Sequence, residues 1–466
     1  MIVEAPAGAG APPRSDAIWI AALALEVRLA VVIWAATRFP PTADGTYYQR
    51  IAERVAQGLG YTWLWPDGAV TYAAHYPIGY PAAVGALYRC TGPHPWAAMV
   101  LNAVLGTVAV YAAHRLAARS GSRTIALVAG LLVALHPGLV AYTPALMTEG
   151  VVASLVVLAA GVAAWTRDRP ASRWLGLSLL GLVLGAATLV RPQSLVLAPL
   201  FAAIAVDGSV RRRLTAAALA TVVTLAVCAP WTARNCVRMK QCALVSVNGG
   251  WNLLIGADAA STGAWSPVQV PDACREVYDE AEKDRCFGRA AQGFIAAHPL
   301  AWLALAPKKL AATFDYAGAA GWYLHASNPG AFPERAKLAL GAVETLFERV
   351  VLVLALAGMA RRPGGDEPRR RRVVRLAVAL VGVASALTLH AWIGYVALVV
   401  VALLRGRALL RGPVLFGATA ATVAATVATH AVFFGAGRYS LVVFPLVAAL
   451  AALAFAPTPP EGTPRL

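Results

Sequence analysis

The chain has 466 residues, of which 59% are hydrophobic and only 14% are charged, and its mean hydropathy is +0.63. This composition is too apolar for an ordinary soluble globular protein, so we expect a protein whose main solvent is lipid. The formal net charge of +17 would suit a nucleic-acid-binding protein, but the basic residues do not gather on one face with aromatic residues between them. We therefore expect no nucleic acid as a partner.

Apolar runs recur along almost the whole chain. A bilayer core about 30 Å thick requires about 20 apolar residues per helix, so each run of that length is a candidate span. The sequence therefore predicts an all-α polytopic membrane protein with about twelve transmembrane helices, at residues 17–36, 96–114, 124–142, 149–165, 174–190, 193–207, 214–230, 343–360, 373–390, 392–404, 414–432 and 439–456. The segments 193–207 and 392–404 are short enough to be tilted or re-entrant.

Most arginines fall in alternate short loops between these spans, for example Arg119, Arg169, Arg212 and Arg407. Because loops rich in Lys and Arg stay on the cytoplasmic side, this pattern predicts that both termini are cytoplasmic. The resulting division has a disordered tail at 1–16, an N-terminal transmembrane module at 17–230 with an external loop at 37–95, an external subdomain at 231–342, a C-terminal transmembrane module at 343–456 and a second tail at 457–466.

Four of the six cysteines lie in the segment 231–342, where an oxidising compartment would allow two disulfides. Pairing Cys236 with Cys242 and Cys274 with Cys286 is the local option, one of three connectivities. Free thiols are the alternative, because a sequence does not fix the distances between Cα atoms. Apolar and charged residues alternate at helical spacing from 274 to 310, so we expect this external subdomain to be small and mainly helical.

The first external loop begins with an acidic residue. Asp44 introduces a short amphipathic helix that carries Tyr47, and the loop ends in a turn that starts at His75 and places Tyr76 and Tyr80 beside prolines and a glycine. Asp44 is either a helix N-cap or a reactive carboxylate at the membrane surface. The aromatic residues either anchor the protein at the interface or form a platform for a sugar or a prenyl chain.

Glu149 lies at the short external turn between the third and fourth predicted spans. A carboxylate at this depth is costly unless it is paired, binds a cation or is functional. Its neighbours are mostly apolar, and Thr143 or Thr148 could cap the following helix in its place. This setting favours a functional role for Glu149.

Three arginines lie at the external ends of spans. They are unexpected there, because Lys and Arg are enriched in the cytoplasmic loops of membrane proteins. They are Arg191, Arg234 and Arg438, and Tyr439 follows the last of them. A guanidinium group binds phosphate through paired donors and keeps its charge. Snorkelling or a salt bridge explains any single arginine as well, but three on one side of the membrane favour a site for a phosphate.

The order of these features resembles the GT-C membrane glycosyltransferases, in particular the bacterial branch similar to dolichyl-phosphate-mannose protein mannosyltransferases and aminoarabinose lipid A transferases. The resemblance covers most of the chain. Its motifs are Asp44-Gly-Thr-Tyr-Tyr, Gly58-Leu-Gly-Tyr61, Tyr76-Pro-Ile-Gly-Tyr-Pro81, Leu146-Met-Thr-Glu149, Leu189-Val-Arg-Pro192, Pro230-Trp-Thr-Ala-Arg-Asn235 and Gly437-Arg-Tyr439.

This resemblance implies an enzyme of the cytoplasmic (inner) membrane that moves a sugar from a polyprenyl-phosphate donor to an envelope lipid, glycan or protein on the external face. It implies that Asp44 is the catalytic carboxylate and Glu149 a second acidic residue nearby. The three external arginines would stabilise the departing phosphate. Family members often carry two adjacent acidic residues in the first loop, whereas this chain has Ala43 before Asp44. No cofactor is therefore assigned, and a divalent metal ion is left open.

A multi-pass transporter or flippase of envelope precursors is the alternative, since many spans with internal charges suit that class too. Against it, the two halves show no repeat symmetry and no matching pair of helices broken by Gly or Pro. A transporter also has little need for the predicted external segment 231–342.

Overall fold

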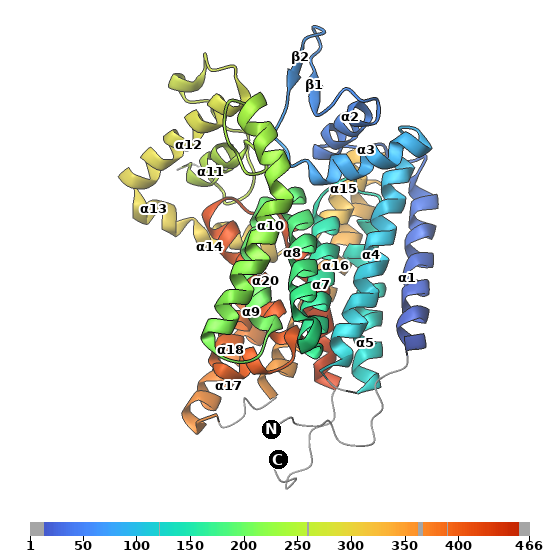
Figure 1. Cartoon of the computed structure of the whole chain (residues 1–466), viewed down its shortest axis with the longest axis vertical. Coiled ribbons are helices and arrows are strands. Elements are labelled where there is room, and N and C mark those ends of the chain that lie inside the picture. The colour runs from blue at the N-terminus through green and yellow to red at the C-terminus, as the bar shows by residue number, and fades with distance from the viewer. Residues whose placement is uncertain (1–13, 121, 259–260, 362–366, 389, 456–466) are drawn as a thin grey trace.

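The computed structural model describes residues 14–120, 122–258, 261–361, 367–388 and 390–455. In these residues, long helices run up and down in a bundle, and shorter elements gather at the end drawn uppermost in Figure 1. The predicted tails, 1–16 and 457–466, lie outside the described residues, except that the first helix already begins at Arg14.

The N-terminal part of the chain passes repeatedly between the two ends of the bundle. Its helices are α1 (Arg14–Ala35), α4 (Pro95–Ala118), α5 (Arg123–Ala134), α6 (Pro137–Ala141), α7 (Glu149–Asp168), α8 (Arg173–Val190), α9 (Leu197–Ala205) and α10 (Val210–Arg238), with 3-10 turns η1 (Pro170–Ser172) and η2 (Pro192–Val196). Helix α7 packs against both α4 and α8, and its small residues Ala153, Ala160 and Ala164 are buried. Small side chains let helices approach closely where lipid provides no hydrophobic drive for association.

Helix α10 continues beyond the end of its predicted span at residue 230. Pro230 lies inside this helix, although proline removes a backbone hydrogen bond and often ends a helix. The following turn is held from outside, because Trp231 Nε1 donates to Val245 O at 2.7 Å and Thr232 Oγ1 donates to Leu244 O at 2.8 Å. The extension of α10 therefore fixes the position of residues 243–245.

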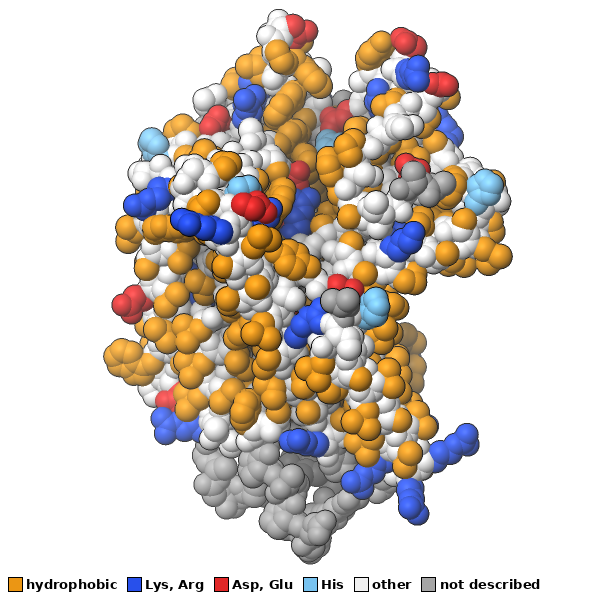
Figure 2. Space-filling model, turned by 180° about the vertical axis from the view of Figure 1, so that it is seen from behind, with side chains coloured by type: hydrophobic (Ala, Val, Ile, Leu, Met, Phe, Trp, Pro, Cys, Tyr) orange, Lys and Arg blue, Asp and Glu red, His pale blue; other side chains and the backbone are white. Residues whose placement is uncertain are grey.

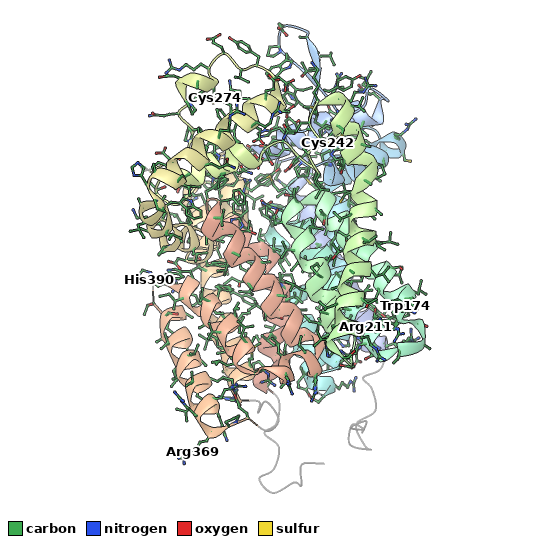
Figure 3. The ribbon with its side chains drawn as sticks, turned by 60° about the vertical axis from the view of Figure 1, so that its left-hand side comes forward. Trp174, Arg211, Cys242, Cys274, Arg369 and His390 are labelled. Atoms are coloured by element: carbon green, nitrogen blue, oxygen red, sulfur yellow. A yellow bond between two sulfur atoms is a disulfide. The ribbon has the colours of Figure 1, made fainter. Side chains whose placement is uncertain are left out.

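The upper end carries the elements that connect the long helices. After α1 come α2 (Asp44–Ala56), the antiparallel hairpin β1 (Thr62–Leu64) and β2 (Val70–Tyr72), and α3 (Gly79–Thr91). After α10 come α11 (Gly249–Ala257), η3 (Asp272–Cys274), α12 (Glu280–Ala297), α13 (Pro299–Ala304), α14 (Ala306–Phe314) and α15 (Ala319–Ser327). Disulfides join Cys236 to Cys242 and Cys274 to Cys286, and both lie at this end (Figure 3).

The C-terminal part completes the bundle. Its elements are α16 (Glu334–Arg361), α17 (Arg369–Ala386), α18 (Ala391–Leu404), α19 (Arg407–Arg411), α20 (Val414–Val432), η4 (Gly437–Val442), α21 (Phe444–Ala451) and η5 (Ala452–Phe455). Every residue of α21 is buried, because α5, α16 and α20 surround it. Helix α16 begins before the predicted start of its span at residue 343.

Several helices have the length and apolarity that a bilayer requires. Among the described residues, six could cross a membrane: α1, α4, α7, η1 with α8, α10 and α20. Four further apolar stretches are shorter, at Arg123–Ala134, Pro192–Ala205, Ala391–Leu404 and Phe444–Phe455. The remaining two predicted spans correspond to α16 and α17, which include charged residues such as Glu348 and Arg375.

The outer surface of the bundle is suited to contact with lipid. Large apolar side chains point outward, for example Ile33 of α1, which is 77% exposed. Figure 2 shows apolar side chains over much of one face and Lys and Arg side chains along its lower border. The chain is thus a polytopic, mainly helical membrane protein, while the number of twelve spans stays a prediction.

Candidate active site

A cleft of about 670 Å³ opens at the upper end of the bundle. Four chain segments meet around it: the start of α2, the start of α7, the end of α8 and the turn η4. Among the predicted site residues, those that line it are Asp44, His75, Tyr76, Glu149, Arg191, Arg438 and Tyr439. The opposite wall comes from the segment 241–252 and from α12.

Asp44 is the first residue of α2, and its carboxylate points away from its own helix. Oδ1 accepts a hydrogen bond from the Tyr76 hydroxyl at 2.8 Å, and Oδ2 accepts one from Arg438 Nη1 at 2.8 Å. The N-cap position belongs to Ala43, whose φ of 51° is unusual for a residue with a side chain. Strained backbone of this kind clusters at functional sites. Asp44 is therefore not the N-cap of α2, and its carboxylate contacts residues outside that helix.

Two glycines allow the segments around Asp44 to approach one another. A Cβ atom at Gly45 would lie 3.0 Å from both Leu146 O and Tyr323 Oη. A Cβ atom at Gly79 would lie 2.7 Å from backbone atoms of Leu189 and Val190 at the end of α8. The turn that carries Tyr76 can therefore pack directly on the end of α8, next to Arg191.

Glu149 is the first residue of α7, and its side chain is only 2% exposed. Oε1 lies 2.8 Å from Arg191 Nη1 and 3.4 Å from Arg438 Nε, and Oε2 accepts a hydrogen bond from the Tyr142 hydroxyl at 3.2 Å. A carboxylate at a helix N-terminus and the cation Arg191 at the C-cap of α8 both suit the helix dipoles. The buried charge of Glu149 is thus balanced from several directions.

Arg438 joins the two carboxylates, because it contacts Asp44 and Glu149 with different nitrogens. The ring of Tyr439 lies beside both arginines, 4.8 Å from the Arg191 guanidinium carbon and 5.2 Å from that of Arg438. Arg191 contacts Glu149 through Nη1, and a guanidinium group has five N–H donors. Arg191 also lines the cleft, where a guanidinium group can bind an anion.

Burial and charge set the protonation of the groups above the bundle. Burial alone would raise the pKa of Asp44, but the neighbouring Arg438 and the hydrogen bond from Tyr76 outweigh it and lower the pKa below its ordinary value. Burial raises the pKa of Tyr76, and the nearby Asp44 raises it further. Burial lowers the pKa of His75. At neutral pH the cleft therefore presents an ionised Asp44 beside a neutral tyrosine and a neutral histidine.

The wall opposite Asp44 contains polar and aromatic residues that the sequence patterns did not single out. Gln241, Trp265 and Asp284 line the cleft together with Trp251. Asp284 Oδ1 accepts a hydrogen bond from Trp251 N at 2.8 Å, and the Trp251 ring packs on His75 at 5.6 Å between centroids. One signal for Gln241 was its place directly before Cys242 in a small disulfide loop.

Three predicted site residues lie outside the cleft. Arg234 donates to the carbonyl oxygens of Ala73 and Tyr61, each at 2.9 Å, and so holds the hairpin region rather than a ligand. Tyr47 stacks on Trp63 at 4.7 Å between centroids. Tyr80 is buried and lines a different hollow, described next.

An apolar groove of about 550 Å³ lies beside the cleft. It runs between α3, α4, α7, α8 and α10, and Leu101, Leu155 and Val227 are among its lining residues. Val190 lines both the groove and the cleft. A polar site and an apolar site thus meet at the end of α8.

The residues of the cleft do not fit a bound metal ion. In the described part of the chain, no group of three or more His, Cys, Asp or Glu side chains is placed to hold one. Asp44 and Glu149 both face guanidinium groups instead.

Residues 75–233 match the family model of dolichyl-phosphate-mannose-protein mannosyltransferases. The matched range contains His75, Glu149 and Arg191, whereas Asp44 and Arg438 lie outside it. This match confirms the predicted resemblance to membrane glycosyltransferases over about a third of the chain. No curated protein matches the sequence.

Two solved structures align with most of this chain at low sequence identity. An oligosaccharyltransferase of Archaeoglobus fulgidus, tethered to an acceptor peptide, aligns with a TM-score of 0.48 and 14% identity over 94% of this chain and 49% of that chain. ArnT of Cupriavidus metallidurans, bound to undecaprenyl phosphate, aligns with a TM-score of 0.41 and 16% identity over 94% of this chain and 77% of that chain. The present chain spans about half the length of the archaeal protein.

Proposed function

We propose that this protein transfers a sugar from a polyprenyl-phosphate donor to an envelope lipid, glycan or protein at the external face of the cytoplasmic membrane. The observation that carries the proposal is the cleft in which Asp44, Glu149, Arg191 and Arg438 meet beside an apolar groove. A polyprenyl-phosphate donor keeps its chain in the bilayer and its head group at the surface, so it requires polar and apolar sites in contact. The matching family is named for a donor of this class, which supports the donor's chemistry.

Asp44 is the group that takes the proton of the acceptor. An acceptor hydroxyl bound near the carboxylate transfers its proton to Asp44 as its oxygen attacks the anomeric carbon of the sugar. The bond between that carbon and the phosphate oxygen breaks, and polyprenyl phosphate leaves with the bonding electrons. A single displacement of this kind inverts the configuration at the anomeric carbon.

Arg191 and Arg438 bind the phosphate and stabilise the charge that develops on it. Arg438 already holds Asp44 at 2.8 Å, and this contact lowers the pKa of Asp44. A bound phosphate competes for Arg438 and so weakens its hold on Asp44. Donor binding therefore makes Asp44 a stronger base at the moment when the acceptor needs one.

The apolar groove receives the first isoprene units of the donor. Its walls are Leu, Val and Ala side chains with the rings of Tyr80 and Trp231, and burying apolar chain surface provides about 25 cal/mol per Å². Val190 is the point at which the groove meets the cleft. A chain in the groove therefore places its phosphate at the end of α8, next to Arg191.

The test is a comparison of envelope lipids, glycans and exported proteins by mass spectrometry. Cells that lack the protein are complemented with the wild type, with Asp44→Asn or with Asp272→Asn at matched membrane levels. Asp272 is a suitable control because its side chain is 88% exposed and it does not line the cleft. We expect Asp44→Asn to lower sugar transfer by about 10²- to 10⁴-fold and Asp272→Asn to leave it unchanged.

Loss of a sugar-sized mass that only the wild type and Asp272→Asn restore would support the transferase and identify its acceptor. Full restoration by Asp44→Asn would remove the proposed base. If no glycan changes in cells that express the protein, a transporter or flippase of envelope precursors becomes the better explanation.

A further inference from the structure

A second hollow, of about 270 Å³, lies at the lower end of the bundle, opposite the cleft. It opens between the first residues of α8 and the first residues of α10. The polar residues that line it are Arg173, Ser209, Arg211, Arg212 and Thr215. Figure 3 shows Trp174 and Arg211 near each other at this end, far from Cys242 at the other end.

Helices α8 and α10 run in the same direction, so their N-termini meet at this hollow. They pack closely along their length: a Cβ atom at Gly181 would lie 2.7 Å from Val223, and one at Gly185 would lie 2.6 Å from Val227. Thr224 Oγ1 also donates to Gly181 O at 3.1 Å. Because the N-terminus of a helix carries partial positive charge, two parallel helices present that charge to the same space.

The arginines of the hollow differ from their neighbours in how their charge is balanced. Nearby, Arg119 pairs with Asp168 at 2.5 Å, and Arg213 lies 3.6 Å from Asp207. In the part of the chain that the structure describes, Arg173, Arg211 and Arg212 form no ion pair with a carboxylate. Arg212 donates to the backbone oxygen of Asp207, and the Arg173 guanidinium lies over the Trp174 ring at 4.8 Å. Three cations therefore face one space that contains no acidic side chain.

The surroundings of the hollow suit an amphipathic ligand. Trp174, Leu177, Val206 and Ala216 complete its lining. Apolar side chains of α8 and α10 point outward here, including Trp174 at 51% exposure and Leu214 at 65%. Tryptophan is typical of the boundary between head groups and hydrocarbon. A soluble anion would not use this apolar border, whereas the chains of a lipid would.

We propose that this hollow binds the phosphate of one anionic phospholipid from the leaflet opposite the cleft. The phosphate lies between Arg173, Arg211 and Arg212, and the acyl chains follow the exposed apolar side chains of α8 and α10. Basic pockets between transmembrane helices are known to hold phospholipid head groups. The site is independent of the proposed transfer reaction, since no residue of the cleft contributes to it.

The test measures lipid retention by the full-length protein in detergent. Native mass spectrometry records binding of phosphatidylglycerol, with phosphatidylcholine as the neutral lipid and inorganic phosphate as the soluble anion. The double variant Arg173→Gln/Arg211→Gln removes two charges from the hollow. The matched control, Arg369→Gln/Arg370→Gln, removes two charges from the exposed start of α17 at the same end (Figure 3).

We expect one phosphatidylglycerol to bind in preference to phosphatidylcholine, with an affinity that falls about tenfold or more in the hollow variant and stays unchanged in the control. Equal losses in both variants would mean a general effect of surface charge and would overturn the proposal. The proposal would also be overturned if inorganic phosphate at millimolar concentration competed for the hollow as effectively as the lipid does.

A measurement on the wild type keeps the test decisive if the hollow variant does not fold. Phosphatidylglycerol with a photoreactive group near its phosphate is cross-linked to the protein, and the modified peptides are mapped. Labelling concentrated in residues 173–177 and 206–216 supports the site. Labelling concentrated elsewhere, for example on the arginines that begin α17, contradicts it.

Discussion

Asp44 and Glu149 carry the same functional group, yet their surroundings differ. The Asp44 side chain is 24% exposed in the cleft, whereas that of Glu149 is 2% exposed and engaged by two arginines and Tyr142. An acceptor can reach the first carboxylate without displacing its neighbours. The second is better placed to hold Arg191 and Arg438 in position for the phosphate. We therefore assign proton transfer to Asp44 alone.

A third carboxylate, Glu280 of α12, links the two walls of the cleft and titrates near neutral pH. It accepts from the Ala74 backbone N–H at 3.3 Å, and burial raises its pKa to about 7. A group whose pKa is raised on folding stabilises the fold fully below its unfolded pKa of about 4.3, and this contribution is lost as the pH rises through 7. Because burial penalises the charged carboxylate, Glu280 should contribute less to the stability of the fold in mildly alkaline solution.

We expect Glu280→Gln to be more stable than the wild type at pH 8 by about 1–3 kcal/mol, and nearly equal to it below pH 4.5. Glutamine keeps an oxygen that can accept from Ala74 and carries no charge that burial would penalise. Thermal unfolding in detergent at several pH values measures the difference. Other titrating groups, such as His75, cancel in this comparison. Glu282→Gln, an exposed change on the same helix, should show no such pH-dependent gain, and a similar gain there would contradict the assignment.

The sequence could identify most charged residues of the cleft, because charge near the external end of a span is costly and therefore informative. It could not separate Arg191 and Arg438 from Arg234, since all three follow a span in similar local settings. Tertiary neighbours make the difference: Arg234 meets backbone carbonyls of the hairpin, while the other two meet Glu149. Asp284 was missed because no local pattern points to it, and Gln241 was missed although it directly precedes Cys242 in a small loop.

At the scale of elements, the segment that carries Arg438 depends on a contact from α14. Lys309 is fully buried, and its Nζ donates to Ala431 O at 3.3 Å and to Val432 O at 2.9 Å. These are carbonyls at the C-terminal end of α20, which have no partner within the helix. The loop that follows also pairs with another segment, because Gly435 N donates to Gly263 O at 2.8 Å. Lys309 therefore fixes the point from which the chain turns toward the cleft.

We expect Lys309→Met to loosen this turn, although Lys309 does not line the cleft. Leaving buried carbonyls without a donor costs about 1–3 kcal/mol, so amide hydrogen exchange in residues 431–438 should accelerate about 5- to 100-fold. Lys308→Met is the matched control, because Lys308 is exposed on the same helix. Unchanged exchange in Lys309→Met, measured by mass spectrometry of the peptides from this region, would show that the turn is held by other contacts.

Elements were predictable where one physical rule dominates. Helices such as α1 and α20 follow from the length of apolar sequence that a bilayer requires. The end of α10 did not follow, because Pro230 is a helix breaker by local rules and only the bonds of Trp231 and Thr232 to residues 244–245 explain why the helix continues. The hairpin of β1 and β2 was likewise not predicted, and its residues were treated as part of the external loop.

At the scale of the whole molecule, the cleft is built from distant parts of the chain. Asp44 and Arg438 are separated by 394 positions, so only the completed bundle brings them together. The alternation of spans places all the contributing helix ends at one end of the bundle. The hollow of α8 and α10 lies at the other. The proposed chemistry therefore depends on which end faces the exterior of the cell.

The exposed free cysteine Cys90, near the end of α3 at the cleft end, tests this orientation. The other free cysteine in the described residues, Cys228, is buried, and four more are in disulfides. If the cleft faces the exterior, a membrane-impermeant maleimide added to spheroplasts should label the wild type before lysis and should not label Cys90→Ser. A cysteine placed at Arg369 in the Cys90→Ser background should react only after lysis.

In the reverse pattern, Cys90 is protected until lysis and position 369 is labelled in intact spheroplasts. That result would mean that the cleft faces the cytoplasm. The cleft would then draw its donor from the cytoplasmic leaflet, where nucleotide-linked sugars are also present, and the choice of a polyprenyl-phosphate donor would rest on the apolar groove alone. The anionic lipid at Arg173, Arg211 and Arg212 would come from the external leaflet. Orientation thus decides the location of both sites, while the geometry of each remains the same.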